Sequence, residues 1–305
     1  MSLAANKATF RKIPEQIYNR GELNIARSVM VPNYVEHLRL PEGLPAGRAG
    51  FEEFVQMWRT AVPDLTYKVT HLTPDFLIGE GELVVLRIEG SGTHRGPLLG
   101  VPPTGRPMDW TETHIGRFEN GLLVEHWAEI DKFRILQALG TVEGFVPRAP
   151  APPPVIVDER YLTSAELRGL LTRLVEEVWN EGRLEIADEI FHPKATTPGE
   201  SEQPLGPAGV QAAVAAFRSG FSDYRVSIED TVVEYPYMAG RLRRSGTHDG
   251  PFAGLAATGR QISYGEILIV RVGNGQIVES WSDADMLGLL DQLQAESGAS
   301  GPASA

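Results

Sequence analysis

Two stretches of the chain repeat each other, and this duplication limits the possible folds more than any other feature of the sequence. Residues 91–106 and 245–260 are identical at ten of sixteen positions, and the same separation of 154 residues also holds for residues 120–131. Closer to the N-terminus, residues 18–26 match residues 179–187 at a separation of 161, a drift that changes in loop length produce. We therefore predict two copies of one domain in a chain of 305 residues.

The predicted domain boundaries follow from this repeat and from the composition between the copies. The first domain is expected at residues 6–140 and the second at 158–294, which are ordinary lengths for single domains. Residues 141–157 are expected to be a linker, because their proline-rich run is typical of a stiff, extended spacer. The small polar residues 295–305 are expected to form a disordered tail.

Hydrophobic periodicity predicts the same order of elements in each copy. Apolar side chains in residues 51–62 recur at the spacing of one helical face, and residues 210–221 repeat the pattern. Residues 108–118 alternate like a strand, and the dipeptides Asn120-Gly121 and Asn274-Gly275 are typical of tight hairpin turns. Helices that precede strands joined by hairpins predict an α+β fold with a mostly antiparallel sheet. We expect two tandem cone-shaped α+β barrels, each a curved sheet closed by its N-terminal helices around an internal pocket.

Composition excludes several classes of function. The chain has 28 Lys and Arg against 40 Asp and Glu residues, a net charge of −12, and an acidic surface repels nucleic-acid phosphates. No apolar run approaches the ~18 residues of a membrane span, and the N-terminus has no apolar core of signal-peptide length. The absence of cysteine excludes disulfides, thiolate metal sites and a cysteine nucleophile. We therefore expect a cytoplasmic protein that binds neither nucleic acid nor membranes.

The sequence carries no familiar motif for a metal or a cofactor. His37, His94, His114 and His126 show neither the H-x-H nor the H-E-x-x-H spacing of common metal sites. There is no G-x-S-x-G elbow of a serine hydrolase, no G-x-x-x-x-G-K-[ST] phosphate loop and no G-x-G-x-x-G dinucleotide turn. We expect no metal and no cofactor.

Both copies carry the run G-T-H-x-G-P-x-x-G-x-x-x-T-G-R, followed by N-G-x-x-V-E-x-W-x-x-x-D and a leucine-rich helix. This pattern resembles the SnoaL-like polyketide cyclase (ester cyclase) family of the nuclear transport factor 2-like superfamily. The resemblance implies the cone-shaped fold and a small, apolar, carbonyl-bearing substrate. It does not fix the reaction, because that superfamily also contains isomerases, epoxide hydrolases and non-enzymatic binders.

The resemblance also implies particular site residues. The acid/base aspartate of the family lies four residues after the tryptophan of the E-x-W motif, which is Asp131 in the first copy and Asp285 in the second. A supporting histidine on the preceding strand would be His114, and a pocket histidine in the Y-V-x-H pattern would be His37. The pocket positions shared by the copies are His94 and His248, Trp110 and Tyr264, Glu112 and Glu266, and Trp127 and Trp281.

Strand alternation gives an independent prediction of which side chains meet. Trp110, Glu112 and His114 share one face of their strand, and Trp127 shares a face with Asp131. If both faces look into the cone, a carboxylate and an imidazole form a general acid/base pair in an apolar pocket that raises the aspartate's pKa. A slip of one residue would reverse the assignment.

Each candidate also has a structural interpretation. Asp131 and Asp285 precede helices and could act as N-caps, while His94 and His248 could tie down their loops. Glu112 and Glu266 could be solvated, and the tryptophans and Tyr264 could belong to the core. His126 precedes Trp127 on the same strand and so points to the opposite face, and it is expected on the surface.

Three functions remain open on the sequence alone. The first is a cofactor-independent acid/base enzyme whose first copy catalyses an aldol closure or isomerisation. The second is a non-catalytic binding or scaffold protein, since the second copy lacks counterparts of His37, His114 and His126. The third is an epoxide-opening or hydrolytic enzyme that pairs Asp131 with Glu112 or Glu129. The two copies are expected to pair as an intramolecular pseudo-dimer, which would make the chain a monomer.

Overall fold

A computed structural model describes residues 2–69, 77–142, 155, 161–197 and 206–294. Most of the expected linker and the whole expected tail therefore lie outside the described residues. In the part of the chain that the structure describes, no helix is both long and apolar enough to cross a membrane.

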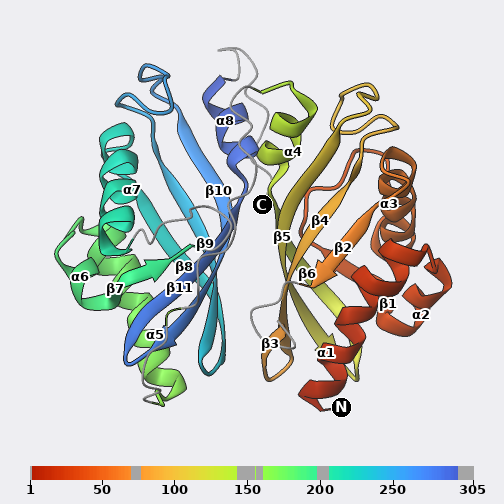
Figure 1. Cartoon of the computed structure of the whole chain (residues 1–305), viewed down its shortest axis with the longest axis horizontal. Coiled ribbons are helices and arrows are strands. Elements are labelled where there is room, and N and C mark those ends of the chain that lie inside the picture. Colours follow the sequence, from red (N-terminus) through yellow and green to blue (C-terminus); the bar gives the residue numbers. More distant parts are fainter. Residues whose placement is uncertain (1, 70–76, 143–154, 156–160, 198–205, 295–305) are drawn as a thin grey trace.

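The first half folds as one sheet with its N-terminal helices on one side (Figure 1). Its strands run in the order β1-β6-β5-β4-β2, with β3 also paired to β4; β1 and β6 are parallel and the other pairs antiparallel. In chain order the elements are α1 (Leu3–Lys12), the π-helix η1 (Ile13–Tyr18), η2 (Leu23–Ile25), α2 (Ala26–Val29), β1 (Met30–Glu36), α3 (Gly47–Ala61), β2 (Thr66–Val69), β3 (Leu77–Glu80), β4 (Leu83–Thr93), β5 (Pro107–Glu119), β6 (Leu122–Ile130) and α4 (Lys132–Leu139).

The second half repeats this topology, with its strands in the order β7-β11-β10-β9-β8. Its elements are α5 (Ser164–Arg173), the π-helix η3 (Leu174–Asn180), α6 (Ile186–Ile190), β7 (Phe191–Thr196), α7 (Gly206–Gly220), β8 (Arg225–Glu234), β9 (Tyr237–Thr247), β10 (Gln261–Gly273), β11 (Gln276–Ala284) and α8 (Met286–Gln294). The predicted duplication and the α+β fold class are confirmed.

The long hairpins turn where the sequence predicts. Asn120 and Gly121 both adopt positive φ angles, 50° and 79°, and Asn274 and Gly275 do the same at 50° and 82°. Two consecutive left-handed residues make the turn whose twist matches that of the flanking strands, and Asn-Gly is the dipeptide that tolerates it best.

The two sheets pack against each other through their outer faces, while helices cover the inner faces (Figure 1). Apolar side chains from both halves form a shared core at this contact, among them Ile115 and Trp281. Asp283 of β11 is buried in the same contact and accepts hydrogen bonds from Thr111 and Thr113 of β5. The halves are thus joined by a sandwich of two sheets with a polar bond inside it.

Candidate active site

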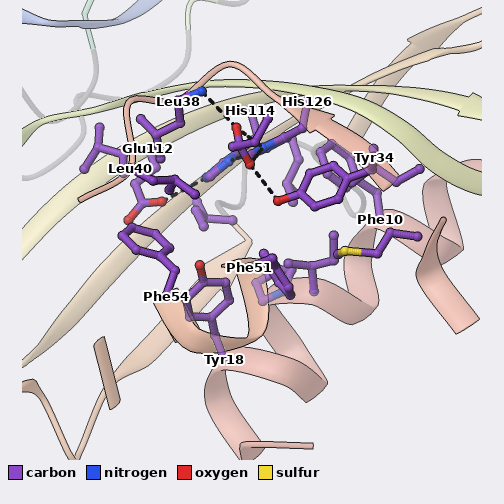
Figure 2. Close-up of a pocket in the computed structure, with 18 residues that line it drawn as sticks. Phe10, Tyr18, Tyr34, Leu38, Leu40, Phe51, Phe54, Glu112, His114 and His126 are labelled. Carbon is purple, nitrogen blue, oxygen red and sulfur yellow. Dashed lines mark hydrogen bonds and ion pairs between the residues drawn. The ribbon is translucent and has the colours of Figure 1, made fainter. Parts of the chain in front are cut away.

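The helices and inner sheet face of the first half enclose a cavity of about 40 Å³ (Figure 2). Most of its walls are apolar or aromatic, with Phe10, Phe51 and Phe54 contributed by the helices. Its polar side chains are Tyr18, Tyr34, Glu36, Glu112, His114 and His126. An apolar pocket with a few convergent polar groups is the usual form of a small-molecule site.

Glu112 of β5 begins a chain of polar contacts through this cavity. It is 4% exposed, and its Oε1 accepts hydrogen bonds from Tyr67 Oη at 2.6 Å and Trp110 Nε1 at 2.5 Å. Its Oε2 lies 3.0 Å from His114 Nε2, at ion-pair distance but out of line for a hydrogen bond. Burial alone would raise the pKa of Glu112, but a protonated His114 and the two donors outweigh it, so the pKa lies below its usual value.

The contacts continue through two imidazoles to a second carboxylate. His114 Nδ1 lies 3.1 Å from His126 Nε2, and His126 Nδ1 lies 2.8 Å from Glu36 Oε2. Glu36 also accepts from Tyr34 Oη at 3.0 Å and from the backbone N–H of Leu38 at 2.9 Å. Burial raises the pKa of Glu36, yet His126 and these donors bring it below the usual value.

The number of protons in this chain sets its chemistry. An ionised carboxylate only accepts hydrogen bonds, so His126 Nδ1 must carry a proton toward Glu36, and a second proton lies between the imidazoles. These two protons make both histidines neutral and leave a lone pair on His114 Nε2 beside Glu112. A third proton converts the pair into one imidazolium between two carboxylates. In that form the imidazolium charge lies between the carboxylates of Glu112 and Glu36.

The backbone register explains how four residues far apart in sequence meet. A bulge at Arg117 and Phe118 shifts the pairing of β5 with β6, so that His114 lies opposite Ala128 and Gly116 opposite His126. His126 thereby reaches the inner face. Parallel pairing of β1 with β6 then sets Glu36 directly beside His126.

Comparison with known proteins agrees with this architecture. The family model for SnoaL-like polyketide cyclases matches residues 8–139 and again residues 169–293. The chain belongs to the SnoaL-like polyketide cyclase family. Aklanonic acid methyl ester cyclase DnrD of Streptomyces peucetius is 31% identical over 130 residues, which are 40% of this chain and 88% of the relative.

Two further proteins have a similar sequence identity to this chain. Nogalonic acid methyl ester cyclase of Streptomyces nogalater is 29% identical over 119 residues, 38% of this chain and 88% of the relative. The solved structure of TsrD from Streptomyces laurentii is 26% identical with a TM-score of 0.42, covering 47% of this chain and 99% of that one. The two cyclases each correspond in length to about one half of the chain.

Some predicted site residues do lie at the cavity of the first half. Glu112 and His114 line it, as the alternation of β5 predicts. Trp110 lies behind them in the core, packed between Trp58 and Tyr67, and touches the site only through its hydrogen bond to Glu112.

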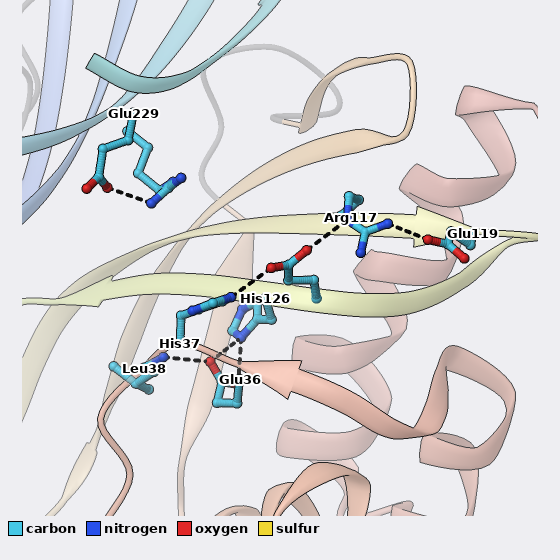
Figure 3. A network of polar contacts seen from close by, with 9 residues as sticks. Glu36, His37, Leu38, Arg117, Glu119, His126 and Glu229 are labelled. Carbon is cyan, nitrogen blue, oxygen red and sulfur yellow. Dashed lines mark hydrogen bonds and ion pairs between the residues drawn. The ribbon is translucent and has the colours of Figure 1, made fainter. Parts of the chain in front are cut away.

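The predicted faces of β6 are wrong. Trp127 lies on the outer face of β6, where the ring of His37 stacks on it with 4.8 Å between the ring centres, and neither Trp127 nor His37 lines the cavity. His37 also bonds to Glu125 at 2.9 Å (Figure 3). His126, expected on the surface, lines it instead. The cause is the bulge, which moves every residue of β6 beyond it to the opposite face relative to an unbroken hairpin.

The predicted positions of Asp131 and Asp285 also need correction. β6 ends at Ile130, and the Asp131 carboxylate caps helix α4 by accepting from the backbone N–H of Arg134 at 3.0 Å. Asp285 accepts in the same way from Gly288 at 3.1 Å before α8. Neither aspartate lines the inner cavity of its half, and the N-cap explains its recurrence in both copies.

The loop histidines and the remaining counterparts in the second half have separate places. His94 and His248 are fully buried, and each bonds through Nδ1 to a threonine ten residues later at 3.0 Å. Trp281 lies in the core between the halves. Glu266 lines the inner cavity of the second half, and Tyr264 is bonded to Tyr224 at 2.8 Å.

Sequence reasoning missed the contribution of strand β1. Tyr34 and Glu36 complete the polar chain, yet the resemblance pointed only to the neighbouring His37. Because side chains alternate along a strand, Tyr34 and Glu36 share one face of β1 and His37 lies on the other, and this pattern would have indicated both residues. Among the residues that the structure describes, no group of three or more His, Asp or Glu is arranged to hold a metal ion.

Proposed function

We propose that the first half is a cofactor-independent acid/base cyclase acting on an apolar molecule that carries carbonyl groups. The observation that carries this proposal is the chain Glu112–His114–His126–Glu36 in an apolar cavity. Family membership supports the reaction class. The named relatives close rings in the methyl esters of aklanonic and nogalonic acid, and we extend the proposal to ester substrates of that kind.

In the proposed step, His114 Nε2 removes a proton from a carbon between two carbonyls. The electron pair of that C–H bond forms an enolate, whose carbon attacks a second carbonyl carbon of the same molecule. The new C–C bond closes the ring, and the electron pair of the attacked C=O moves to its oxygen. That oxygen takes the proton back from the imidazolium, so the product is an isomer of the substrate and no co-reactant is consumed.

The two carboxylates and a tyrosine have supporting roles in this proposal. Glu112 and Glu36 stabilise the imidazolium formed by the first step. Burial, aided by the charges of Glu112 and Glu36, raises the pKa of Tyr18 well above its usual value, so its phenol stays protonated. Its hydroxyl is directed toward the cavity in Figure 2, where it would donate a hydrogen bond to the enolate oxygen.

Substrate entry requires one wall of the cavity to move. A volume of about 40 Å³ is far below the ~300–1,000 Å³ of ordinary ligand pockets. Leu38 and Leu40 line the cavity from the connection between β1 and α3, in which residues 39 and 41–43 are exposed. We assign this connection as the part that is displaced when substrate binds.

The experiment compares His114, which lines the cavity, with His37, which lies on the outer face. Cyclisation of aklanonic acid methyl ester by the purified chain would be followed by chromatography, with His114→Gln as the test and His37→Gln as the control. We expect His114→Gln to lower kcat by about 10²-fold or more, the usual contribution of a general base. His37→Gln should remain within about twofold of the unaltered chain, because His37 lies on the outer face. Equal activity of the two variants would refute the assigned role of His114.

The hydrolytic alternative loses its structural basis. It requires Asp131 beside Glu112 or Glu129 in one cavity, but Asp131 caps α4 and Glu129 lies on the outer face of β6.

A further inference from the structure

A cleft of about 240 Å³ lies between the outer faces of the two sheets, at one side of their contact. Strand β6 of the first half forms one wall, and strands β9 and β10 of the second half form the other. Lys132, the first residue of α4, and Asp285, the residue before α8, also line it, and these two helices lie side by side where the sheets meet (Figure 1). The cleft is distinct from the two inner cavities, which the opposite faces of the sheets line.

The repeat shows that the equivalent place at the other side of the contact is filled. There, Trp281, Asp283 and Arg87 are each at most 5% exposed. Asp283 lies 3.3 Å from Arg87 and accepts hydrogen bonds from Thr111 and Thr113. Two hydroxyls, one carboxylate and one guanidinium thus close that side without leaving a cleft.

The hydroxyls that close the contact are absent on the cleft side. The repeat places Gly265 and Ile267 where the first half has the two threonines, and Glu129 where the second half has the aspartate. The carboxyl of Glu129 lies against Gly265 and makes no hydrogen bond with a residue that the structure describes. The cleft is therefore the space that a bonded polar cluster fills on the other side.

Two cations lie beside this carboxyl. Burial raises the pKa of Glu129 to about 8, and the charges of Lys132 and Arg243, which lower it, act from close by. Both cations line the cleft. At the equivalent positions of the other side, the repeat has Met286 in place of the lysine and Glu89 in place of the arginine. These two positive charges are therefore a property of the cleft side alone.

The charges that line the cleft favour an anion. The charged groups among its described lining residues, His37 apart, are four cations and three acids: Arg39, Lys132, Arg241, Arg243, Glu129, Glu229 and Asp285. Glu129 holds its proton near neutral pH, and Lys132 forms no ion pair or hydrogen bond with any described residue. A positive cleft in a chain with a net charge of −12 attracts anions to this place and not to the surface around it.

The groups that converge in the cleft fit a carboxylate. The ammonium of Lys132 and the guanidinium of Arg243 donate hydrogen bonds, and so does the carboxyl of Glu129 when it is protonated. The two oxygens of a carboxylate have about four lone pairs and can accept all three bonds. Trp127 and Ile267 also line the cleft and can contact a small apolar part of the same molecule.

We propose that the cleft between the two halves binds a small organic carboxylate, whose oxygens accept hydrogen bonds from Lys132, Arg243 and Glu129. Because the first half supplies two of these residues and the second half the third, the site exists only where the halves are paired. The proposal does not rest on the activity proposed for the first half.

The test is isothermal titration calorimetry on the full chain with sodium benzoate, and with benzamide as the uncharged molecule of the same shape. We expect benzoate to bind with a dissociation constant of about 1 mM or below, and benzamide to bind about tenfold more weakly or worse. Lys132→Met, which introduces the residue of the equivalent position, and Arg243→Gln should each weaken benzoate binding about three- to tenfold. Lys68→Met removes an exposed charge on β2, outside the cleft, and should leave it unchanged.

The third donor is tested through pH. Benzoate should bind about tenfold more weakly at about pH 9 than at about pH 7, because an ionised Glu129 repels the anion and no longer donates. Glu129→Gln keeps an uncharged donor at all pH values, so its affinity should be nearly the same at both. The other charged groups that face Glu129 are present in both chains: His37, Lys132, Glu229, Arg241, Arg243, Asp283 and Asp285.

The outcomes separate this proposal from the one made for the first half. Benzoate binding that is unchanged in both Lys132→Met and Arg243→Gln would overturn the site. Benzamide that binds as tightly as benzoate, or inorganic phosphate that binds more tightly, would overturn the ligand class. Equal pH dependence in the unaltered chain and in Glu129→Gln would remove Glu129 from the proposed donors. His114→Gln should bind benzoate as the unaltered chain does, so its turnover and its calorimetry decide the two proposals independently.

Discussion

The two halves of the chain share the contacts that hold the backbone and differ in the side chains that line their cavities. The side-chain amide of Asn19 donates to the backbone carbonyl of Tyr67 at 2.8 Å and accepts from its N–H at 2.7 Å. Asn180 makes the same two hydrogen bonds to the backbone of Val226, at 2.9 and 2.8 Å. Asp64 binds the N–H and hydroxyl of Thr93 as Asp223 binds those of Thr247. Most residues that recur in both copies therefore explain the fold, with Glu112 and its counterpart Glu266 as the exception, and the rest of the polar chain consists of residues that do not recur.

The same contrast exists where the halves meet. Glu129 of β6 and Asp283 of β11 occupy equivalent positions on the outer faces of their sheets. Asp283 is bonded to two threonines and lies 3.3 Å from Arg87, whereas Glu129 faces Gly265, where an added Cβ would lie 2.0 Å from its Oε1. The shorter acid is paired with hydroxyls and the longer one lies against a glycine, so equivalent acids make different contacts in the two halves.

The largest effect on stability is expected from removing the carboxylate of Asp283, which accepts hydrogen bonds at this contact. Asp283 is 2% exposed, so Asp283→Ala removes a buried acceptor from the guanidinium of Arg87 and from two hydroxyls. We expect a loss of about 3–5 kcal/mol in the free energy of unfolding, the usual cost of removing one partner of a buried ion pair. Urea denaturation would measure it. Ser227→Ala, an exposed change on β8, provides a control that should stay within about 0.5 kcal/mol of the unaltered chain. Equal midpoints for the two variants would show that the polar bond is unimportant.

The contribution of Glu129, the equivalent acid of the first half, to the free energy of unfolding should depend on pH. Burial, reinforced by the charge of Asp285, raises the pKa of Glu129 to about 8, although Lys132 and Arg243 lower it. The folded chain then holds a proton that the unfolded chain releases, so this group makes stability fall as pH rises from about 4.5 to about 8, by at most about 1.4 kcal/mol per pH unit. Glu129→Gln should remove this part of the slope and be more stable than the unaltered chain at about pH 9.

Thermal unfolding of both chains between about pH 5 and about pH 9 checks this expectation. The charged and titratable groups at the cleft beside Glu129 include Lys132, Glu229, Arg241, Arg243 and Asp285. They are present in both chains, so the difference between the two pH profiles isolates Glu129. Parallel profiles would contradict the raised pKa.

The duplication, the fold class and the hairpin turns could be predicted from the sequence, because period and turn chemistry are local properties. The inner face of β5, with Glu112 and His114, could also be predicted from strand alternation. The face of β6 could not be predicted, because a single bulge opposite Arg117 and Phe118 adds one residue to β6 and breaks its alternation, so that Leu123 and His126, three residues apart, both line the cavity. Glu36 was missed because its partner His126 is 90 residues away and is brought to it by parallel pairing of β1 with β6.

The smallest effect concerns the aspartates before the last helix of each half, which recur like the rest of the scaffold. If Asp131 acts as an N-cap, Asp131→Ala should lower the free energy of unfolding by about 0.5–2 kcal/mol, and Asp131→Ser should restore most of it, since serine caps as well. Turnover of the first half should stay within about threefold in both variants, because the carboxylate does not line the cavity. Denaturation and the cyclisation assay on the same preparations decide the point. A large loss of kcat in Asp131→Ser, with stability retained, would return this aspartate to the catalytic site, as a second recurring residue besides Glu112 that serves the chemistry.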